Sequence, residues 1–196
     1  ELAYQLNDAG AETIIIYGGS TPVLAEILEQ TPVKNVITID LGDGAGLPIP
    51  SPAVDSRIPH PVRFADVLTE GAELALEPVE LSGEDILFFQ YTGGTTGPSK
   101  GAVLTHRNLI ANVEQYRAVM KEACVLGEEV VVLALPLYHI FGLMVMMAYS
   151  PLGARQILIP NPRDMDAFVG AIKDAKFSVI PGVNTMFQGL TMHPEA

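Results

Sequence analysis

Short runs of apolar residues recur along this chain, and most are followed by a turn and a segment with helical periodicity. These runs are apolar throughout rather than alternating, which is typical of strands buried on both faces of a sheet. Strands that alternate with helices predict an α/β fold with a largely parallel sheet and helices on both of its faces. The predicted strands are 13–17, 36–39, 86–90, 102–105, 130–134, 156–159 and 177–180.

Capping residues and apolar spacing predict the helices between these strands. Ser20 is a candidate N-cap for a helix that runs to Leu28. Thr105 or His106 is the candidate N-cap of a helix that ends near Lys121, and Gly10 is expected to end a helix at the start of the chain. Further helices are expected at 64–69, 141–148, 165–173 and 184–192.

A loop-rich stretch around residues 70–83 divides the sequence into two parts. Residues 1–81 are predicted to form a small α/β unit with a Pro- and Gly-rich loop at 41–61. Residues 82–196 are predicted to form a larger α/β subdomain. Ligands of such sheets bind at the carboxyl ends of the strands, so the loops after strands are the first places to look for a site.

Residues 130–154 contain no Asp, Glu, Lys or Arg, and this length would suffice to cross a bilayer. Pro136 and Pro151 interrupt the stretch, however, and Tyr138 and His139 lie near its middle. The β-branched run that begins at Val130 favours a buried strand, followed by a loop and a buried helix.

The charge balance excludes some partners. The chain has 196 residues and a net charge of −12, from 23 acidic and 11 basic residues, which argues against a nucleic-acid partner. It is 48% hydrophobic, which is enough for a real core. The single cysteine, Cys124, excludes an intramolecular disulfide and is compatible with a reducing compartment.

The segment Tyr91–Gly101, YTGGTTGPSKG, follows a predicted strand and combines glycines, hydroxyl side chains and one lysine. Its spacing does not fit the Walker A loop, the dinucleotide fingerprint or the kinase glycine loop. Glycines let a backbone approach an anion, successive N–H groups can bind phosphate oxygens, and lysine adds a positive charge. By composition alone, a phosphate-binding loop and a solvated loop without chemistry stay open.

The order of residues in Tyr91–Gly101 resembles the signature loop of the adenylate-forming superfamily, and Ala102–Leu109 continues the match. Leu135–Gly142, LPLYHIFG, resembles a second motif of that superfamily. Within it, bacterial long-chain fatty-acyl-CoA ligases are the most similar branch, by Tyr4–Ala11, Asn161–Asp164 and Pro181–Phe187. The resemblance implies the Rossmann-like layered fold of the large N-terminal domain of these enzymes.

The resemblance also implies a reaction: a fatty acid and Mg·ATP give acyl-AMP and pyrophosphate, and coenzyme A then takes the acyl group. The implied phosphate-binding residues are Thr92, Gly93, Gly94, Thr95, Thr96, Gly97 and Lys100, with Thr92 also a Mg²⁺ ligand. The implied acyl and adenylate pocket contains Tyr138, His139, Ile140, Phe141 and Leu143. His139 is the implied catalytic residue; its alternative is a core histidine bonded to the backbone.

Motifs that the family carries further along its sequence are not present here, so the chain is expected to be an internal piece of a longer enzyme, inactive by itself. Such a piece should expose apolar surface and self-associate. The longer enzyme is expected in the cytoplasm, with peripheral contact at the inner face of the membrane. Two alternatives stay open: an adenylate-forming enzyme for aryl or amino acids, and a non-catalytic anion-binding or interaction module.

Overall fold

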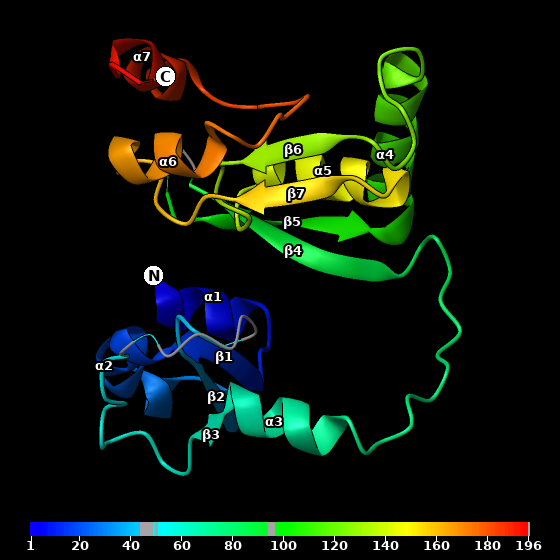
Figure 1. Cartoon of the computed structure of the whole chain (residues 1–196). Helices are drawn as coiled ribbons and strands as arrows, with labels where there is room; N and C mark the ends of the chain where they lie inside the picture. Colours follow the sequence, from blue (N-terminus) through cyan, green and yellow to red (C-terminus); the bar gives the residue numbers. More distant parts are fainter. Residues whose placement is uncertain (44–48, 50, 94–96, 196) are drawn as a thin grey trace. The chain divides into compact units, whose positions relative to one another are not determined.

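The computed structural model describes residues 1–43, 49, 51–93 and 97–195. The chain forms two compact units (Figure 1). Unit 1 comprises Glu1–Leu81 and Phe88–Val103, and unit 2 comprises Ser82–Leu87 and Leu104–Ala196. The two-part division made from the sequence stays a prediction about domains; in the structure, the glycine-rich segment groups with unit 1.

Unit 1 is built on a three-stranded parallel sheet in the order β1-β2-β3. Residue Thr13 lies opposite Asn35 in the register of β1 and β2. The elements are α1 (Leu2–Asp8), β1 (Thr13–Tyr17), α2 (Thr21–Ala25), β2 (Asn35–Ile39), β3 (Val62–Arg63) and α3 (Phe64–Gly71), with 3-10 turns at Gly18–Ser20 and Leu28–Gln30. Apolar side chains from α1, β1, α2 and β2 fill its core, where Leu6, Ile16, Leu24 and Val36 are buried with Ile58.

The helix predicted from Ser20 to Leu28 is shorter in the structure, because α2 ends at Ala25. Ser20 is its N-cap residue but makes no side-chain capping bond. The Thr21 hydroxyl, fully buried, donates instead to the Gly18 carbonyl at 2.6 Å, which tightens the turn ahead of α2. Gly10 has φ +61°, and the left-handed conformation there ends α1 as predicted.

The strands β4 (Ile86–Thr92) and β5 (Lys100–Thr105) pair with each other and are shared between the two units. α4 (His106–Met120) follows β5 directly. Thr105 is its N-cap, as predicted: its hydroxyl accepts from the Asn108 N–H at 3.3 Å, and the Thr105 N–H donates to Asn108 Oδ1 at 3.0 Å. This reciprocal capping fixes the point where the chain leaves β5.

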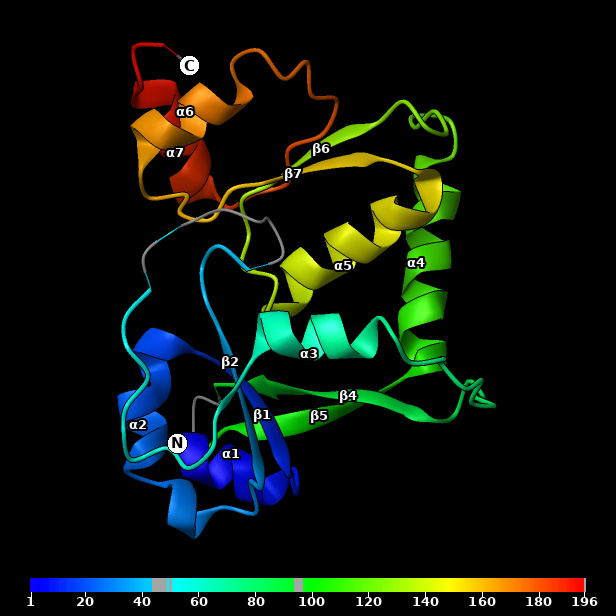
Figure 2. The ribbon, with the colours of Figure 1, turned by 60° about the horizontal axis from the view of Figure 1, so that its bottom comes forward.

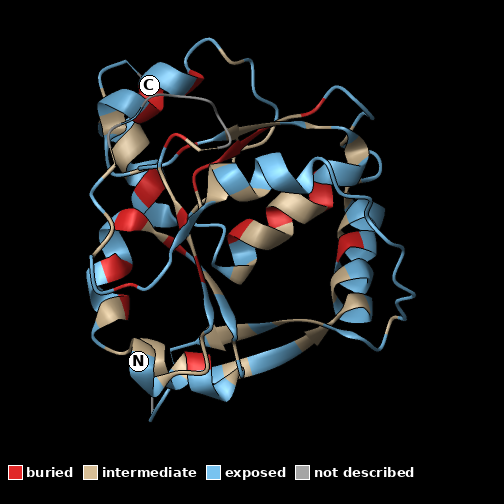
Figure 3. Cartoon of the chain, turned by 90° about the horizontal axis from the view of Figure 1, so that it is seen from below, coloured by how far each residue is buried: buried red, intermediate tan, exposed pale blue. Residues whose placement is uncertain are grey.

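Unit 2 contains a parallel pair, β6 (Val130–Leu133) and β7 (Arg155–Leu158), in which Val130 lies opposite Arg155. Its helices are α5 (Ile140–Tyr149), α6 (Met165–Ile172) and α7 (Asn184–Met192). Val131 and Leu133 pack toward α5, whereas Val132 packs with Phe168 of α6 on the opposite face. Figure 2 shows α5, β6 and β7 from a second side, and Figure 3 marks the buried residues in red. The predicted α/β class, with parallel strands covered on both faces, is confirmed, although the described strands form three small sheets.

The strand predicted at 177–180 does not form. Val179 makes only an isolated parallel bridge with Val131. Lys176 has φ +45°, which is not a strand conformation. The Ser178 hydroxyl accepts a hydrogen bond from the Val130 N–H at 3.1 Å, and a regular strand at 177–180 would need this N–H for its own pairing with β6. Pro181 has no N–H to extend the pairing, so the segment follows β6 without becoming a strand.

The apolar stretch 130–154 forms β6, α5 and a 3-10 turn at Ser150–Leu152, which confirms the predicted strand, loop and helix. Within the described residues, no helix combines the length and apolar character that a membrane crossing needs.

Candidate functional site

The glycine-rich segment joins β4 to β5. Thr92 is the last residue of β4, Lys100 is the first residue of β5, and both are exposed. Gly93 and Gly97 lie between them, whereas the predicted phosphate-binding residues Gly94, Thr95 and Thr96 lie outside the described residues.

The two described glycines have open space where a side chain would stand. A Cβ on Gly93 or Gly97 would meet no heavy atom within 4 Å, so a ligand could approach the backbone there. Gly97 has φ +91°, a conformation that L side chains rarely adopt, so this position requires glycine. Lys100 forms no salt bridge with any described residue, and its charge is available to an anion.

Residues at both ends of the glycine-rich segment form hydrogen bonds with α1. The Tyr91 hydroxyl donates to Asp8 Oδ2 at 2.6 Å, and this hydrogen bond to a carboxylate raises the pKa of Tyr91 to about 12. Ser99 is buried, and its Oγ accepts from Gln5 Nε2 at 3.1 Å. The open glycine segment is therefore held at two fixed ends.

The second motif connects β6 to α5. A Cβ on Gly142 would lie well inside contact distance of the Pro136 carbonyl oxygen, so the first turn of α5 packs against the loop only with glycine there. His139 is the N-cap of α5, and its Nδ1 accepts from the Phe141 N–H at 3.2 Å. The ring is bonded to the backbone, as the alternative for His139 expected, but the residue is exposed rather than in the core.

A cavity of about 670 Å³ lies at the carboxyl ends of β6 and β7. Its lining consists of Leu133–Tyr138 and Leu158–Arg163, the strand ends and the loops that follow them. Of the predicted acyl-pocket residues, Tyr138 lines this cavity, and Ile140 lines a smaller one of about 220 Å³ with Met144. The other predicted acyl-pocket residues, His139, Phe141 and Leu143, are not among the described residues that line either cavity.

The segment Asn161–Asp164 resembles bacterial long-chain fatty-acyl-CoA ligases, but it was not predicted to line a pocket. The cavity is lined by Asn161 and Arg163, which add a polar amide and a positive charge to apolar walls. The signal was available, because a proline-containing loop directly follows the predicted strand at 156–159, and such loops line sites on parallel sheets.

No group of three or more His, Cys, Asp or Glu side chains in the described part of the chain could hold a metal ion. Thr92, the predicted Mg²⁺ ligand, is exposed at the end of β4 and offers one neutral hydroxyl oxygen. Such a ligand fits Mg²⁺ only where phosphate oxygens and water supply the other positions.

The chain belongs to the AMP-binding enzyme family, whose model matches residues 1–196. The long-chain-fatty-acid–CoA ligase of Salmonella typhimurium is 39% identical over 207 residues, which cover 100% of this chain and 37% of that ligase. The ligase of the same name from Escherichia coli O6:H1 is 38% identical over the same span. The predicted family is thereby confirmed, and the chain spans little more than a third of these relatives.

The fold agrees with solved structures. The inhibitor-bound N-terminal domain of FACL13 from Mycobacterium tuberculosis matches with a TM-score of 0.71 and 22% identity, over 99% of this chain and 43% of that one. At this identity the match concerns the fold alone.

Proposed function

We propose that this chain provides the ATP phosphate loop and part of the acyl-binding region of an ATP-dependent long-chain fatty acid–CoA ligase. The observation that carries the proposal is the whole-chain similarity to long-chain-fatty-acid–CoA ligases at 37–39% identity, together with the open glycine segment at the end of β4. ATP, coenzyme A and a fatty acid are the proposed substrates of the whole protein.

The proposed reaction has two steps. The fatty acid carboxylate attacks the α-phosphorus of ATP, the bond to the bridging oxygen breaks, and pyrophosphate leaves. The coenzyme A thiol then attacks the acyl carbon of acyl-AMP, loses its proton, and releases AMP. The first step requires no general base, because the carboxylate is already ionised at neutral pH.

In this proposal, residues Thr92–Lys100 bind the β- and γ-phosphates. Backbone N–H groups near Gly93 and Gly97 and the Lys100 ammonium would stabilise the negative charge that builds on the departing pyrophosphate. The open space at both glycines and the unpaired state of Lys100 among described groups support this role. Mg²⁺, when bound to Thr92 and phosphate oxygens, would neutralise part of the phosphate charge.

Tyr138, His139, Ile140, Phe141 and Leu143 are proposed to form the acyl and adenylate side of the site. Because His139 Nδ1 accepts a backbone N–H, the neutral ring carries its proton on Nε2. Nε2 could then donate to an oxygen of the carboxylate or the adenylate. The apolar cavity beside Tyr138 supports an acyl ligand.

We further propose a cytoplasmic location, with peripheral contact of the whole enzyme at the inner face of the membrane. The substrate supports this, because long acyl chains partition into bilayers from which the enzyme would collect them.

A chimaera tests the proposed function. This chain would replace the aligned third of the Salmonella ligase, and ATP–pyrophosphate exchange would be measured with oleate, ferulate and amino acids. Exchange that depends on oleate supports the proposal, and exchange only with ferulate or an amino acid contradicts the fatty-acid assignment. A folded chimaera, checked by circular dichroism, that shows no exchange with any acid would contradict the adenylating function and favour a non-catalytic anion-binding module.

A further inference from the structure

Helix α1 contacts the glycine-rich segment at both of its ends. Asp8 accepts the Tyr91 hydroxyl at 2.6 Å, directly before Thr92, and Gln5 donates to Ser99 at 3.1 Å, directly before Lys100. The Tyr91 hydroxyl also lies 3.5 Å from the Gln5 carbonyl oxygen. Two side chains one helical turn apart therefore reach the two flanks of the segment.

Tyr91 is fixed at its ring as well as at its hydroxyl. A Cβ on Gly101 would lie 3.0 Å from Tyr91 Cζ, so the ring covers this glycine of β5. The Tyr91 hydroxyl is the donor in its hydrogen bond to the Asp8 carboxylate, and this bond raises the pKa of Tyr91 to about 12. Asp8 thus fixes a ring that is already held between the two strands.

The attachment of α1 to unit 1 does not need these contacts. Leu6 is buried in the core of unit 1, and Asn7 Nδ2 donates to the Gln30 carbonyl at 2.8 Å on a different side of the helix. Among the described residues, the side chains of Gln5 and Asp8 hydrogen-bond to Ser99 and Tyr91 at the two ends of the segment, apart from a longer contact between Gln5 and Glu1. Different residues of α1 therefore attach the helix to the core of unit 1 and contact the glycine-rich segment.

Glycine backbone loses much conformational freedom when it is fixed by a ligand, and this loss opposes binding. Fixing both ends before the ligand arrives reduces the loss, because fewer backbone conformations remain accessible. We propose that Asp8 and Gln5 are positioning residues, through which α1 fixes the two described ends of the segment, at Thr92 and at Lys100, for a polyphosphate. This inference rests on the proposed function, since it names residues that support the same phosphate site.

The experiment compares five variants: Asp8→Ala, Asp8→Asn, Tyr91→Phe, Asn7→Ala and the double variant Asp8→Ala/Tyr91→Phe. In the 196-residue chain, hydrogen–deuterium exchange of the amides between Thr92 and Gly101 is measured beside thermal unfolding. In the chimaera, KM for ATP and for oleate are measured by ATP–pyrophosphate exchange. Tyr91→Phe keeps the ring over Gly101, and Asp8→Asn keeps an oxygen that can accept the Tyr91 hydroxyl.

We expect Asp8→Ala and Tyr91→Phe to speed amide exchange in the segment several-fold and to raise KM for ATP about fivefold, with KM for oleate unchanged. Asp8→Asn should restore both values, and the Asp8→Ala/Tyr91→Phe double variant should be no worse than either single variant. Asn7→Ala should lower stability without either effect.

Unchanged segment exchange and KM for ATP in Asp8→Ala and Tyr91→Phe would overturn the inference, as would an Asp8→Asn variant as impaired as Asp8→Ala. A chimaera without exchange for any acid would instead count against the proposed function. In that case the amide exchange in the 196-residue chain still decides whether α1 orders the segment.

Discussion

The carbonyl oxygen of Pro136 lies where a methyl group on Gly142 would have to stand. The contact joins the loop after β6 to the first turn of α5, and thereby sets the start of the helix behind His139. We predict that Gly142→Ala lowers the free energy of unfolding by about 1–3 kcal/mol, because the added carbon forces backbone apart. Thermal unfolding should show a drop of roughly 2–4 °C per kcal/mol for a chain of this size.

Gly170 provides the matched control for this substitution. It lies in α6, and a Cβ there would meet no heavy atom within 4 Å. Gly170→Ala should therefore leave stability unchanged or raise it by up to about 1 kcal/mol, the helix preference of alanine over glycine. Equal effects at both positions would show that the Pro136 contact does not constrain Gly142.

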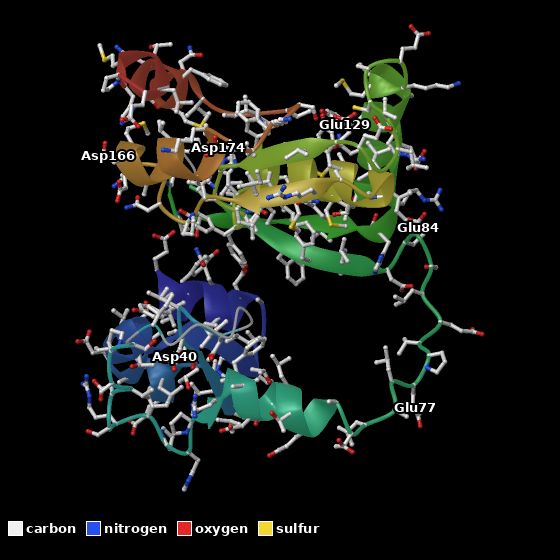
Figure 4. All side chains as sticks on the ribbon, viewed as in Figure 1. Asp40, Glu77, Glu84, Glu129, Asp166 and Asp174 are labelled. Atoms are coloured by element: carbon white, nitrogen blue, oxygen red, sulfur yellow. The ribbon has the colours of Figure 1, made fainter. Side chains whose placement is uncertain are left out.

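Glu129, labelled in Figure 4, directly precedes β6. Its carboxylate is buried and accepts hydrogen bonds from the Val125 N–H at 2.7 Å and from the Ser178 hydroxyl. These hydrogen bonds, that from Ser178 first, lower the pKa of Glu129. We predict that Glu129→Gln destabilises the chain by roughly 1–2 kcal/mol at pH 7, because the amide can accept only at its oxygen.

The lowered pKa also predicts a pH dependence. A carboxyl whose pKa is lower in the folded state stabilises the fold above its unfolded value of about 4.3 and loses this contribution as the pH falls through the folded pKa. Urea unfolding between pH 7 and pH 3 should thus show a steeper acid loss in the natural chain than in Glu129→Gln. Glu128→Gln, at an exposed neighbour, should behave like the natural chain.

Two substitutions of His139 separate its capping bond from its proposed contact with substrate. His139→Ala removes the cap of α5 and should cost about 1 kcal/mol of stability, whereas His139→Asn keeps a capping oxygen and should restore it. Both should lower exchange activity in the chimaera, because both lack Nε2. Full exchange activity in His139→Asn would show that His139 only caps α5 and makes no needed contact with substrate.

Self-association of the chain is a further prediction. Several large apolar side chains are mostly exposed, Leu76 at 96% and Val119 at 82% among them. In the described part of unit 2, β7 pairs only with β6, which leaves its other edge open, and Leu158 on it is 57% exposed. Light scattering should show mass rising with concentration, and less so in Leu158→Lys. A monomer at all concentrations would refute this.

The sequence predicted elements best where one local signal was sufficient. The run Thr13–Tyr17 forms β1 and Asn184–Met192 forms α7 with the predicted bounds, and Thr105 caps α4. The strand predicted at 177–180 does not form because its pairing needs the Val130 N–H, which lies elsewhere in the chain and donates to the Ser178 hydroxyl instead. The two-residue strand β3 was missed, since pairing across the sheet defines it rather than its composition.

The site was predictable only in part, for a similar reason. The resemblance of Tyr91–Gly101 to the adenylate-forming signature loop implied Gly93, Gly97 and Lys100. In the structure the two glycines have open space beside them and Lys100 is exposed. Asp8 could not be associated with a site from the sequence, because it reaches Tyr91 across 83 positions. Arg163 was missed although its loop follows a predicted strand, because the sequence does not show which strand ends meet at the cavity; the pairing of β6 with β7 decides that.

The most direct test of the central claim is KM for ATP in the chimaera with Lys100→Ala, against Lys121→Ala as the matched control. If residues Thr92–Lys100 bind the triphosphate, loss of the Lys100 charge should raise KM for ATP about tenfold or more, the effect of one charged hydrogen bond. KM for oleate should not change, and Lys121→Ala, an exposed residue beyond the end of α4, should have no effect. Equal KM for ATP in Lys100→Ala and the unsubstituted chimaera would contradict the account.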